Sequence, residues 1–204
     1  MSRSINFIKG FIIPIAGGLL IAILIRTFLF SLVKVDGYSM EPNLHNNERI
    51  LLLKTAAIKR NSVIVFNANG VDGTTTFTND KPTYYVKRVI AIPGDTVKYS
   101  KNGTLYINGK KQSQSYITKA QRVNETLGTT GLLGKGFTLS SIGEHENWPT
   151  TYYKVPNNKY FVMGDNRLKS NDGRFWGLVP KSKVTGVAKA FLWNPHHRLI
   201  NNYK

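Results

Sequence analysis

The sequence predicts a mainly β domain with one transmembrane helix at its N-terminus. Three observations predict this class: residues 10–25 form an uncharged, mostly apolar run, short segments rich in branched and aromatic residues follow it, and 18 glycines among 204 residues indicate many turns. No strong helical periodicity follows the apolar run. A chain of this length accommodates one domain of ordinary size, or a core domain with an insertion.

The apolar run is best explained as a membrane anchor. As a helix, residues 10–25 span about 24 Å, short of a hydrocarbon core of about 30 Å, whereas continuing to Val33 gives about 36 Å. Arg26 can extend its charge to the head groups. A cleaved signal peptide fits less well because Ser31-Leu32-Val33 is a poor cleavage site, and a buried helix is rarely apolar all round. The flanking charges do not determine which end lies inside.

The predicted domain boundary follows Lys34. Residues 1–34 form the N-terminal tail and anchor, and residues 35–204 form the β domain. Within this domain, residues 109–156 are polar and irregular, which predicts an inserted subdomain or a long excursion.

Strand composition marks the elements of the β domain in order. The segments are 48–54, 62–66, 84–92, 96–99, 104–107, 159–163 and 184–193, with weaker signals at 136–140 and 151–155. Residues 67–82 are rich in Gly, Asn, Asp and Thr and predict a loop, and residues 100–103 (SKNG) predict a hairpin turn.

Charge and cysteine content narrow the function classes. Lys and Arg number 28 against 11 Asp and Glu, so the formal net charge is +17, which favours an anionic partner. The basic residues form no dense run, so we expect no nucleic-acid partner and interpret the charge as affinity for anionic membrane lipids. The absence of cysteine excludes disulfides, a thiol nucleophile and cysteine metal ligands. The four histidines show no ligand spacing, so we expect no metal site.

Ser39 is the candidate nucleophile because it follows the predicted anchor closely and would lie at the boundary between lipid and water. The surrounding residues 37–41 (GYSME) are not a G-x-S-x-G elbow, since Glu41 occupies the position of the second glycine. A Ser-His-Asp triad is disfavoured, because no histidine lies beside an obvious strand-anchored acid.

Lys87 is the candidate base. In a strand it shares a face with Tyr85, Val89 and Ala91, while Arg88 points to the opposite face. Burial lowers the pKa of a lysine from about 10.4, and a nearby arginine lowers it further. The neutral amine can then take the proton of a serine hydroxyl. The alternative is a lysine at a sheet edge that extends to water.

Residues 164–177 form a third polar stretch. Its acidic residues lack the spacing of an EF-hand, and a plain polar turn is the alternative. This stretch has residues that could hold Lys87 in position. The Ser170 hydroxyl can accept a hydrogen bond from an amine, and Asp172 can form an ion pair with Arg174.

Together these stretches closely resemble the type I signal peptidase family, the bacterial leader peptidases. Residues 39–44 (SMEPNL) resemble the nucleophile box S-M-x-P-T-L, and residues 61–66 resemble the G-D-I-V-V-F strand. Residues 85–95 (YVKRVIAIPGD) are nearly the whole lysine box, and residues 164–174 resemble G-D-N-R-x-x-S-x-D-S-R. The resemblance covers the chain apart from residues 109–156, and the size and single anchor resemble the Gram-positive branch.

The resemblance implies an activity and a location. Ser39 is then the nucleophile and Lys87 the general base, with Ser170 and Asp172 orienting the lysine, in a largely antiparallel β catalytic domain without metal or cofactor. The substrates are preproteins, cut behind signal peptides with small residues one and three positions before the cut. The N-terminus lies inside, and the domain lies on the outer face of the cytoplasmic membrane.

We expect an extended substrate segment to add as a strand beside the residues preceding Ser39 and beside the Lys87 strand. Shallow apolar pockets would receive the small substrate residues, with Val35, Met40, Leu44, Tyr85 and Val86 as candidate lining. Ser39 would form an acyl-enzyme, and Lys87 would activate the water that releases it.

The sequence departs from the family pattern at several positions. Asn43 replaces a threonine, Asn61-Ser62 replaces Gly-Asp, and Gly173 replaces a serine. Gly37 stands where some members have a serine that completes the oxyanion hole, so the hole depends on the Ser39 N–H and another donor. The two candidate catalytic residues are intact, so we expect activity.

Three other interpretations remain open. A soluble, self-cleaving repressor-type protease also uses a Ser–Lys pair but lacks an anchor. A specialised or non-catalytic relative in surface-protein or fibre assembly would not require both Ser39 and Lys87. A basic nucleic-acid-binding module would bind with a steep salt dependence.

Overall fold

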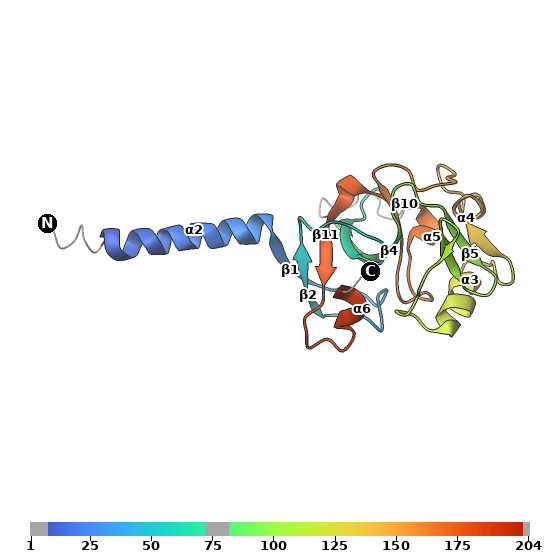
Figure 1. Cartoon of the computed structure of the whole chain (residues 1–204), viewed down its shortest axis with the longest axis horizontal. Helices are drawn as coiled ribbons and strands as arrows, with labels where there is room; N and C mark the ends of the chain where they lie inside the picture. The colour runs from blue at the N-terminus through green and yellow to red at the C-terminus, as the bar shows by residue number, and fades with distance from the viewer. Residues whose placement is uncertain (1–7, 72–81, 202–204) are drawn as a thin grey trace.

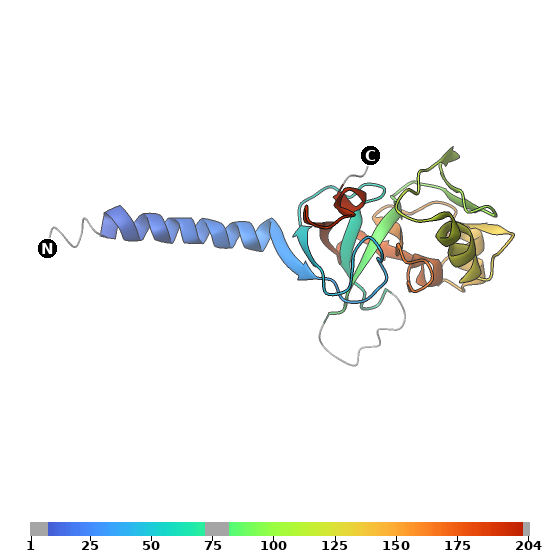
Figure 2. The ribbon, with the colours of Figure 1, turned by 90° about the horizontal axis from the view of Figure 1, so that it is seen from below.

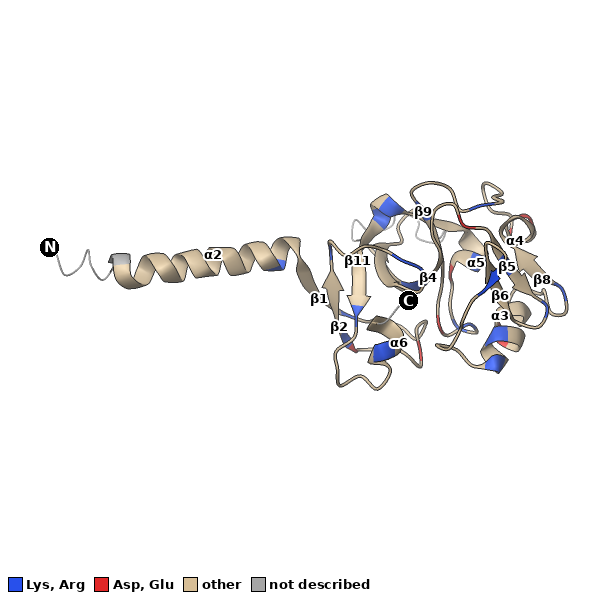
Figure 3. Ribbon diagram, viewed as in Figure 1, with Lys and Arg blue, Asp and Glu red and all other residues tan. Residues whose placement is uncertain are grey.

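A single helix projects from the domain at the N-terminal end of the chain (Figure 1). The computed structural model describes residues 8–71 and 82–201. A π-helical turn, η1 (Ile8–Ile12), leads into α2 (Ile13–Phe28), which buries none of its residues and carries one basic residue, Arg26, in its last turn (Figure 3). The stretch Gly10–Phe28 is long and apolar enough to cross a membrane. This agrees with the predicted N-terminal membrane-spanning helix.

The helix ends before the apolar run does. Phe30–Lys34 form strand β1, which pairs antiparallel with β2 (Arg49–Leu53). The β1 side chains alternate between exposed and half-buried, which is the period of a strand and not of a helix. The predicted continuation of the helix to Val33 is therefore wrong. The helical span has 19 residues, a length of about 28 Å.

Seven strands form the first sheet in the order β1-β2-β11-β3-β4-β9-β10. The further members are β3 (Val63–Asn67), β4 (Tyr84–Ala91), β9 (Lys159–Met163), β10 (Leu178–Pro180) and β11 (Val184–Lys189). All neighbours in this sheet pair antiparallel. Apolar side chains of β3 and β4 enter two separate buried clusters, which explains their nearly continuous apolar sequences. The predicted mainly antiparallel β class is confirmed.

The second sheet lies at the end of the domain away from α2 (Figure 2). Its order is β7-β6-β5-β8, with β5 (Val97–Ser100), β6 (Leu105–Ile107), β7 (Lys110–Lys111) and β8 (Gly136–Thr138). The hairpin between β5 and β6 is the one that the sequence predicts. Because β5 and β6 precede residue 109, the segment 109–156 extends a sheet that begins before it.

Short helices pack beside the second sheet, where the sequence predicts none. These are η2 (Gln121–Glu125), α3 (Thr126–Gly128) and α4 (Leu139–His145). They are too short to show a helical period, although Thr138 caps α4 through a reciprocal bond with Ser141. The weak strand signal at 151–155 is wrong, since no strand forms there.

The C-terminal third contains α5 (Gly173–Trp176), η3 (Lys181–Lys183) and α6 (His197–Asn201). β11 ends at Lys189, before the predicted residue 193, because the Ala190 N–H donates to the Asn201 side chain and so leaves the sheet ladder. Most of the predicted loop 67–82 lies outside the described residues.

Candidate active site

Ser39 and Lys87 come together although 48 positions separate them. The Lys87 Nζ atom donates to the Ser39 Oγ atom at 2.9 Å. Ser39 lies in the turn that follows β1, and Lys87 lies in β4, opposite Ile64 of β3. A lysine amine at this distance can exchange a proton with the hydroxyl directly.

Hydrogen bonds hold the turn around Ser39 on both sides. Gly37 has a φ of 98°, and its N–H donates to Asn46 Oδ1 at 3.0 Å. The Ser39 carbonyl accepts from the Asn166 N–H at 3.0 Å. Among the described residues, the Ser39 N–H has no protein acceptor. It is therefore available to an incoming oxyanion, whereas the Gly37 N–H is already engaged.

The Lys87 side chain is only 4% exposed. Its pKa is lowered to about 8, chiefly by burial and in smaller part by the Arg174 charge, while the charges of Asp172 and Asp165 oppose the change. Arg88, which the sequence suggests as the depressing charge, points away and binds Asp165. A substantial fraction of Lys87 is neutral near pH 8, as a general base requires.

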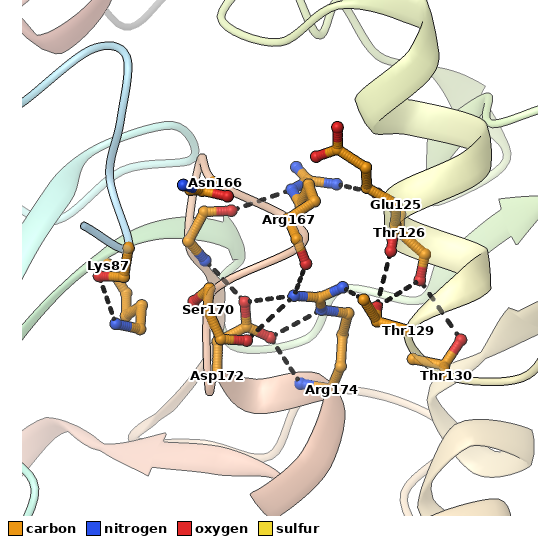
Figure 4. A network of polar contacts seen from close by, with 12 residues as sticks. Lys87, Glu125, Thr126, Thr129, Thr130, Asn166, Arg167, Ser170, Asp172 and Arg174 are labelled. Atoms are coloured by element: carbon orange, nitrogen blue, oxygen red, sulfur yellow. Dashed lines mark hydrogen bonds and ion pairs between the residues drawn. The ribbon is translucent and has the colours of Figure 1, made fainter.

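The predicted ion pair between Asp172 and Arg174 forms in the buried interior beside this lysine. Arg174 Nε lies 2.9 Å from Asp172 Oδ1, and the Gly164 N–H donates to Asp172 Oδ2 at 2.8 Å. Figure 4 shows the Arg174 guanidinium between Asp172 and Thr129, whose hydroxyl accepts at 2.8 Å. Burial raises the pKa of Asp172, but Arg174 and the backbone donors outweigh it and hold the pKa below its ordinary value.

Ser170 is buried next to the Ser39 turn. A β-carbon at Gly164 would collide with Ser170 Oγ and with the Ser39 carbonyl oxygen, so only glycine permits this approach. Within the described part of the chain, Ser170 Oγ has no hydrogen-bond partner. The expected contact from Lys87 to this hydroxyl is therefore absent, and Lys87 instead donates to Ser39.

A second buried ion pair lies on the other side of β4, and sequence reasoning assigned it no role. Arg88 binds both oxygens of Asp165, at 2.8 and 2.6 Å. Asn43 Nδ2 donates to Asp165 Oδ2 at 2.8 Å and to the Tyr116 carbonyl at 2.8 Å. Asp165 thus links the strand of Lys87 to the turn of Ser39. The motifs described above include Asn43, Arg88 and Asp165. They do not indicate that these side chains bind one another.

The segment 109–156 supports the site from the second sheet. Arg167 Nη1 donates to Thr126 Oγ1 at 3.0 Å, and Arg174 Nη1 donates to Thr129 Oγ1 (Figure 4). Both threonines belong to the short helical segment around α3. Nothing in their sequence signals this role, because the bonds span more than 40 positions and depend on the fold.

The candidate pocket residues divide between two clusters. Val35, Met40, Leu44 and Val86 belong to one buried cluster, in which Met40 and Leu44 are at most 1% exposed. Tyr85 is half-buried against the other cluster, and its ring lies 5.0 Å from Lys87 Nζ. Met40 and Leu44 therefore act as core residues in this structure, and Tyr85 is the most accessible of the five.

One side of β4 is open next to Lys87. β3 pairs with Tyr84–Arg88 along one edge, whereas β9 pairs only with Arg88, Val89 and Ala91 along the other. No described strand pairs with Val86 or Lys87 on the β9 side. An extended peptide can add at this edge.

The described residues contain no group of three or more His, Asp or Glu side chains that could hold a metal ion.

Comparison with known proteins identifies close relatives over nearly the whole chain. The family model described as "Signal peptidase, peptidase S26" matches residues 7–193. "Signal peptidase I" of Bacillus licheniformis is 37% identical over 201 residues, which cover 95% of this chain and 90% of that protein. "Signal peptidase I T" of Bacillus subtilis (strain 168) is 38% identical and covers 88% and 82%, respectively.

Similar matches extend to another genus and to a solved structure. "Signal peptidase IB" of Staphylococcus aureus (strain COL) is 33% identical over 96% of this chain and 94% of that protein. The crystal structure of a signal peptidase I from Enterococcus faecalis V583 is 33% identical, with a TM-score of 0.47 over 65% of this chain and 97% of that one.

Proposed function

The chain belongs to the signal peptidase family, peptidase S26, and on this premise we propose that it removes signal peptides from exported preproteins with Ser39 as nucleophile and Lys87 as general base. The observation that carries the proposal is the hydrogen bond of 2.9 Å between Lys87 Nζ and Ser39 Oγ, formed by a buried lysine whose pKa is lowered to about 8.

In the first half of the proposed reaction, neutral Lys87 takes the proton of Ser39. The Oγ atom attacks the carbonyl carbon of the scissile peptide bond, and the resulting oxyanion accepts from the Ser39 N–H. Protonated Lys87 then gives its proton to the departing amine, which leaves as the N-terminus of the mature protein. The signal peptide remains esterified to Ser39.

In the second half, Lys87 is neutral again and takes a proton from a water molecule. The hydroxide attacks the ester carbonyl, and Lys87 returns the proton to Ser39 Oγ as the signal peptide is released. Asp172 and Arg174 hold the surroundings of the amine in place, because both side chains are fully buried and hydrogen-bonded to each other. Ser170 is assigned to orient the amine, because its buried hydroxyl has no hydrogen-bond partner among the described residues and lies beside the Ser39 turn.

Substrate binding follows from the open edge of β4. An extended segment on the amino-terminal side of the cut would pair with the strand at Val86 and Lys87 and present its carbonyl to Ser39. Tyr85 is partly accessible beside the amine and is our first candidate for the wall of a small pocket. Val86 and Val35 would add to the wall of this pocket from the edge of their buried cluster. Met40 and Leu44, which belong to the same cluster, would pack behind that wall.

The proposed location is the cytoplasmic membrane, with α2 as a single span, the N-terminus inside and the catalytic domain outside. The exposed apolar surface of α2 supports a span. Membrane anchoring would raise the effective concentration of a substrate held by its own apolar segment.

We predict that cleavage depends on one ionisation with a pKa near 8. The value of kcat/KM on a preprotein with an Ala-x-Ala site should rise with pH and level off above about pH 9, because only neutral Lys87 accepts the serine proton and its pKa is about 8. The measurement is the initial rate of cleavage in detergent micelles between pH 6 and 10, with Ser39→Ala as the inactive control. A flat profile, or cleavage by Ser39→Ala, would contradict the Ser–Lys assignment.

Asn43 is predicted to position Ser39. Replacing Asn43 with alanine removes its bonds to Asp165 and Tyr116, so kcat should fall about tenfold or more while KM changes little. Asn43→Thr restores a donor to Asp165 and should recover most of the rate. Equal losses in both variants, or a loss that matches the unfolded fraction by circular dichroism, would assign Asn43 a purely structural role.

A non-catalytic role in surface assembly is the second candidate. No feature of the site favours it, since the hydroxyl and amine are in contact and the supporting ion pairs are complete. Folded protein that leaves several preproteins uncut would favour this alternative.

A further inference from the structure

A groove with a volume of about 410 Å³ lies where α2 meets the first sheet. The last turns of α2 line one side of it, and the start of β1 with a part of β2 lines the other. The lining residues are Ala22, Ile25, Arg26, Phe30, Ser31, Leu32 and Leu51. Apart from one arginine and one serine the lining is apolar, and it includes no acidic residue.

The apolar part of this groove is uncovered in the protein. β1 is the edge strand of the sheet, and its Leu32, paired with Leu51 of β2, is 64% exposed. Phe30 is 39% exposed at the same strand end, next to α2. Because the groove lies at the end of a helix that can span a membrane, lipid is the apolar material nearest to it.

Positive charge lies at one side of the groove. Arg26 is exposed on the last turn of α2, and within the described ranges it forms no ion pair with an acid. Lys54 donates to the Thr27 carbonyl at 2.7 Å, which holds a second cation beside the same turn. The groove thus combines apolar surface with one cation in its lining, Arg26, and a second cation lies outside the lining beside the same helical turn.

We propose that this groove binds one anionic phospholipid. An acyl chain would lie against Phe30, Leu32 and Leu51, and the phosphate would bind Arg26 with Lys54 nearby. The apolar segment of a substrate signal peptide fits the charges less well, because it offers no anion to Arg26. The inference rests on the proposed membrane anchoring and is independent of the Ser–Lys chemistry.

The test is lipid retention by the full-length protein, measured by native mass spectrometry after addition of equal amounts of phosphatidylglycerol and phosphatidylcholine in detergent. We expect the protein to retain phosphatidylglycerol preferentially. Arg26→Gln should lower the ratio of retained phosphatidylglycerol to phosphatidylcholine about fivefold, the effect of one basic residue on an anionic lipid surface. Leu32→Gln should reduce the retention of both lipids, because it removes apolar contact.

Lys34→Gln is the matched control. It removes the same charge from an exposed position of β1 that does not line the groove, so the lipid ratio should stay unchanged. An unchanged ratio in Arg26→Gln, or an equal fall in both variants, overturns the proposal. A synthetic signal peptide that displaces both lipids from Ser39→Ala protein, with the same affinity when Arg26 is also replaced, assigns the groove to substrate and overturns it too. None of these readouts requires cleavage, so they are separate from the test of the peptidase activity.

Discussion

Replacing Lys87 with methionine is expected to lower kcat for preprotein cleavage about 10³- to 10⁴-fold, the contribution of a well-placed general base. Methionine has a similar length and fills the buried site, but it cannot accept the proton of Ser39. The amine lies 2.9 Å from Ser39 Oγ, and no other described lysine or histidine is hydrogen-bonded to this hydroxyl. The measurement is single-turnover cleavage in micelles at pH 8.5.

The same variant should fold at least as well as the wild type. The pKa of Lys87 is about 8 in the folded protein and about 10.4 in an unfolded chain. Charged Lys87 therefore destabilises the folded state fully below about pH 8, and this penalty disappears as the pH rises to about 10.4. Lys87→Met should accordingly gain up to about 3 kcal/mol in unfolding free energy at pH 7, with a smaller gain at pH 10.

An exposed lysine supplies the control for this experiment. Lys98→Met changes the second sheet on its outer face and should leave kcat within about twofold, as expected of a surface substitution. If Lys87→Met retained more than about a tenth of the wild-type rate, Lys87 would not be the base. If Lys87→Met unfolded at pH 7, the predicted relief of a buried charge would be wrong.

Asp165→Asn is expected to lower the free energy of unfolding by about 3–5 kcal/mol, the usual cost of leaving one member of a buried ion pair without its partner. Arg88 is 1% exposed and would remain charged without Asp165, because an arginine side chain is effectively always protonated. Asn43 would also lose its charged acceptor. Urea unfolding followed by tryptophan fluorescence measures the effect.

The pair of Arg60 and Asp95 is a suitable comparison. Its distance is also 2.6 Å, but the Arg60 side chain is 39% exposed. Asp95 is only 3% exposed, but without Arg60 it keeps its bonds from the Ile92 N–H and from Asn108. Arg60→Met should therefore cost less than Asp165→Asn, about 1.5–3 kcal/mol. Equal losses in the two variants would show that burial does not govern the strength of the Asp165 pair.

Local sequence predicts most strands of both sheets, but it misses β1 and β10 of the first sheet, β7 of the second, and the short helices beside the second sheet. β3 and β4 are rich in branched and aromatic residues that are buried on both sides of the sheet, so their composition alone predicts strands. The sequence does not reveal β1, because this strand continues the apolar run of the helix. Only the alternating exposure of its side chains distinguishes it from the helix. The helix α3 has three residues and shows no period at all.

In the candidate site, local motifs identify individual residues but do not indicate the long-range contacts between them. Motifs point to Ser39, Lys87 and the loop that carries Asp172, because these stretches have distinctive composition. The bond of Asn43 to Asp165 spans 122 positions, and the contact of Arg174 with Thr129 spans 45. Such contacts depend on the path of the whole chain, so no local pattern could reveal them.

The junction of helix and sheet has a consequence for substrate choice under the proposed topology. One residue, Leu29, separates α2 from β1, and β1 is locked into the sheet by its pairing with β2 over five positions. The distance from the bilayer to Ser39 is therefore set by a strand of about 17 Å and by residues 35–38, whose backbone is hydrogen-bonded to residues 46–48. We therefore expect the protein to cleave only peptide bonds that lie at a fixed height above the membrane and that also have suitable side chains around them.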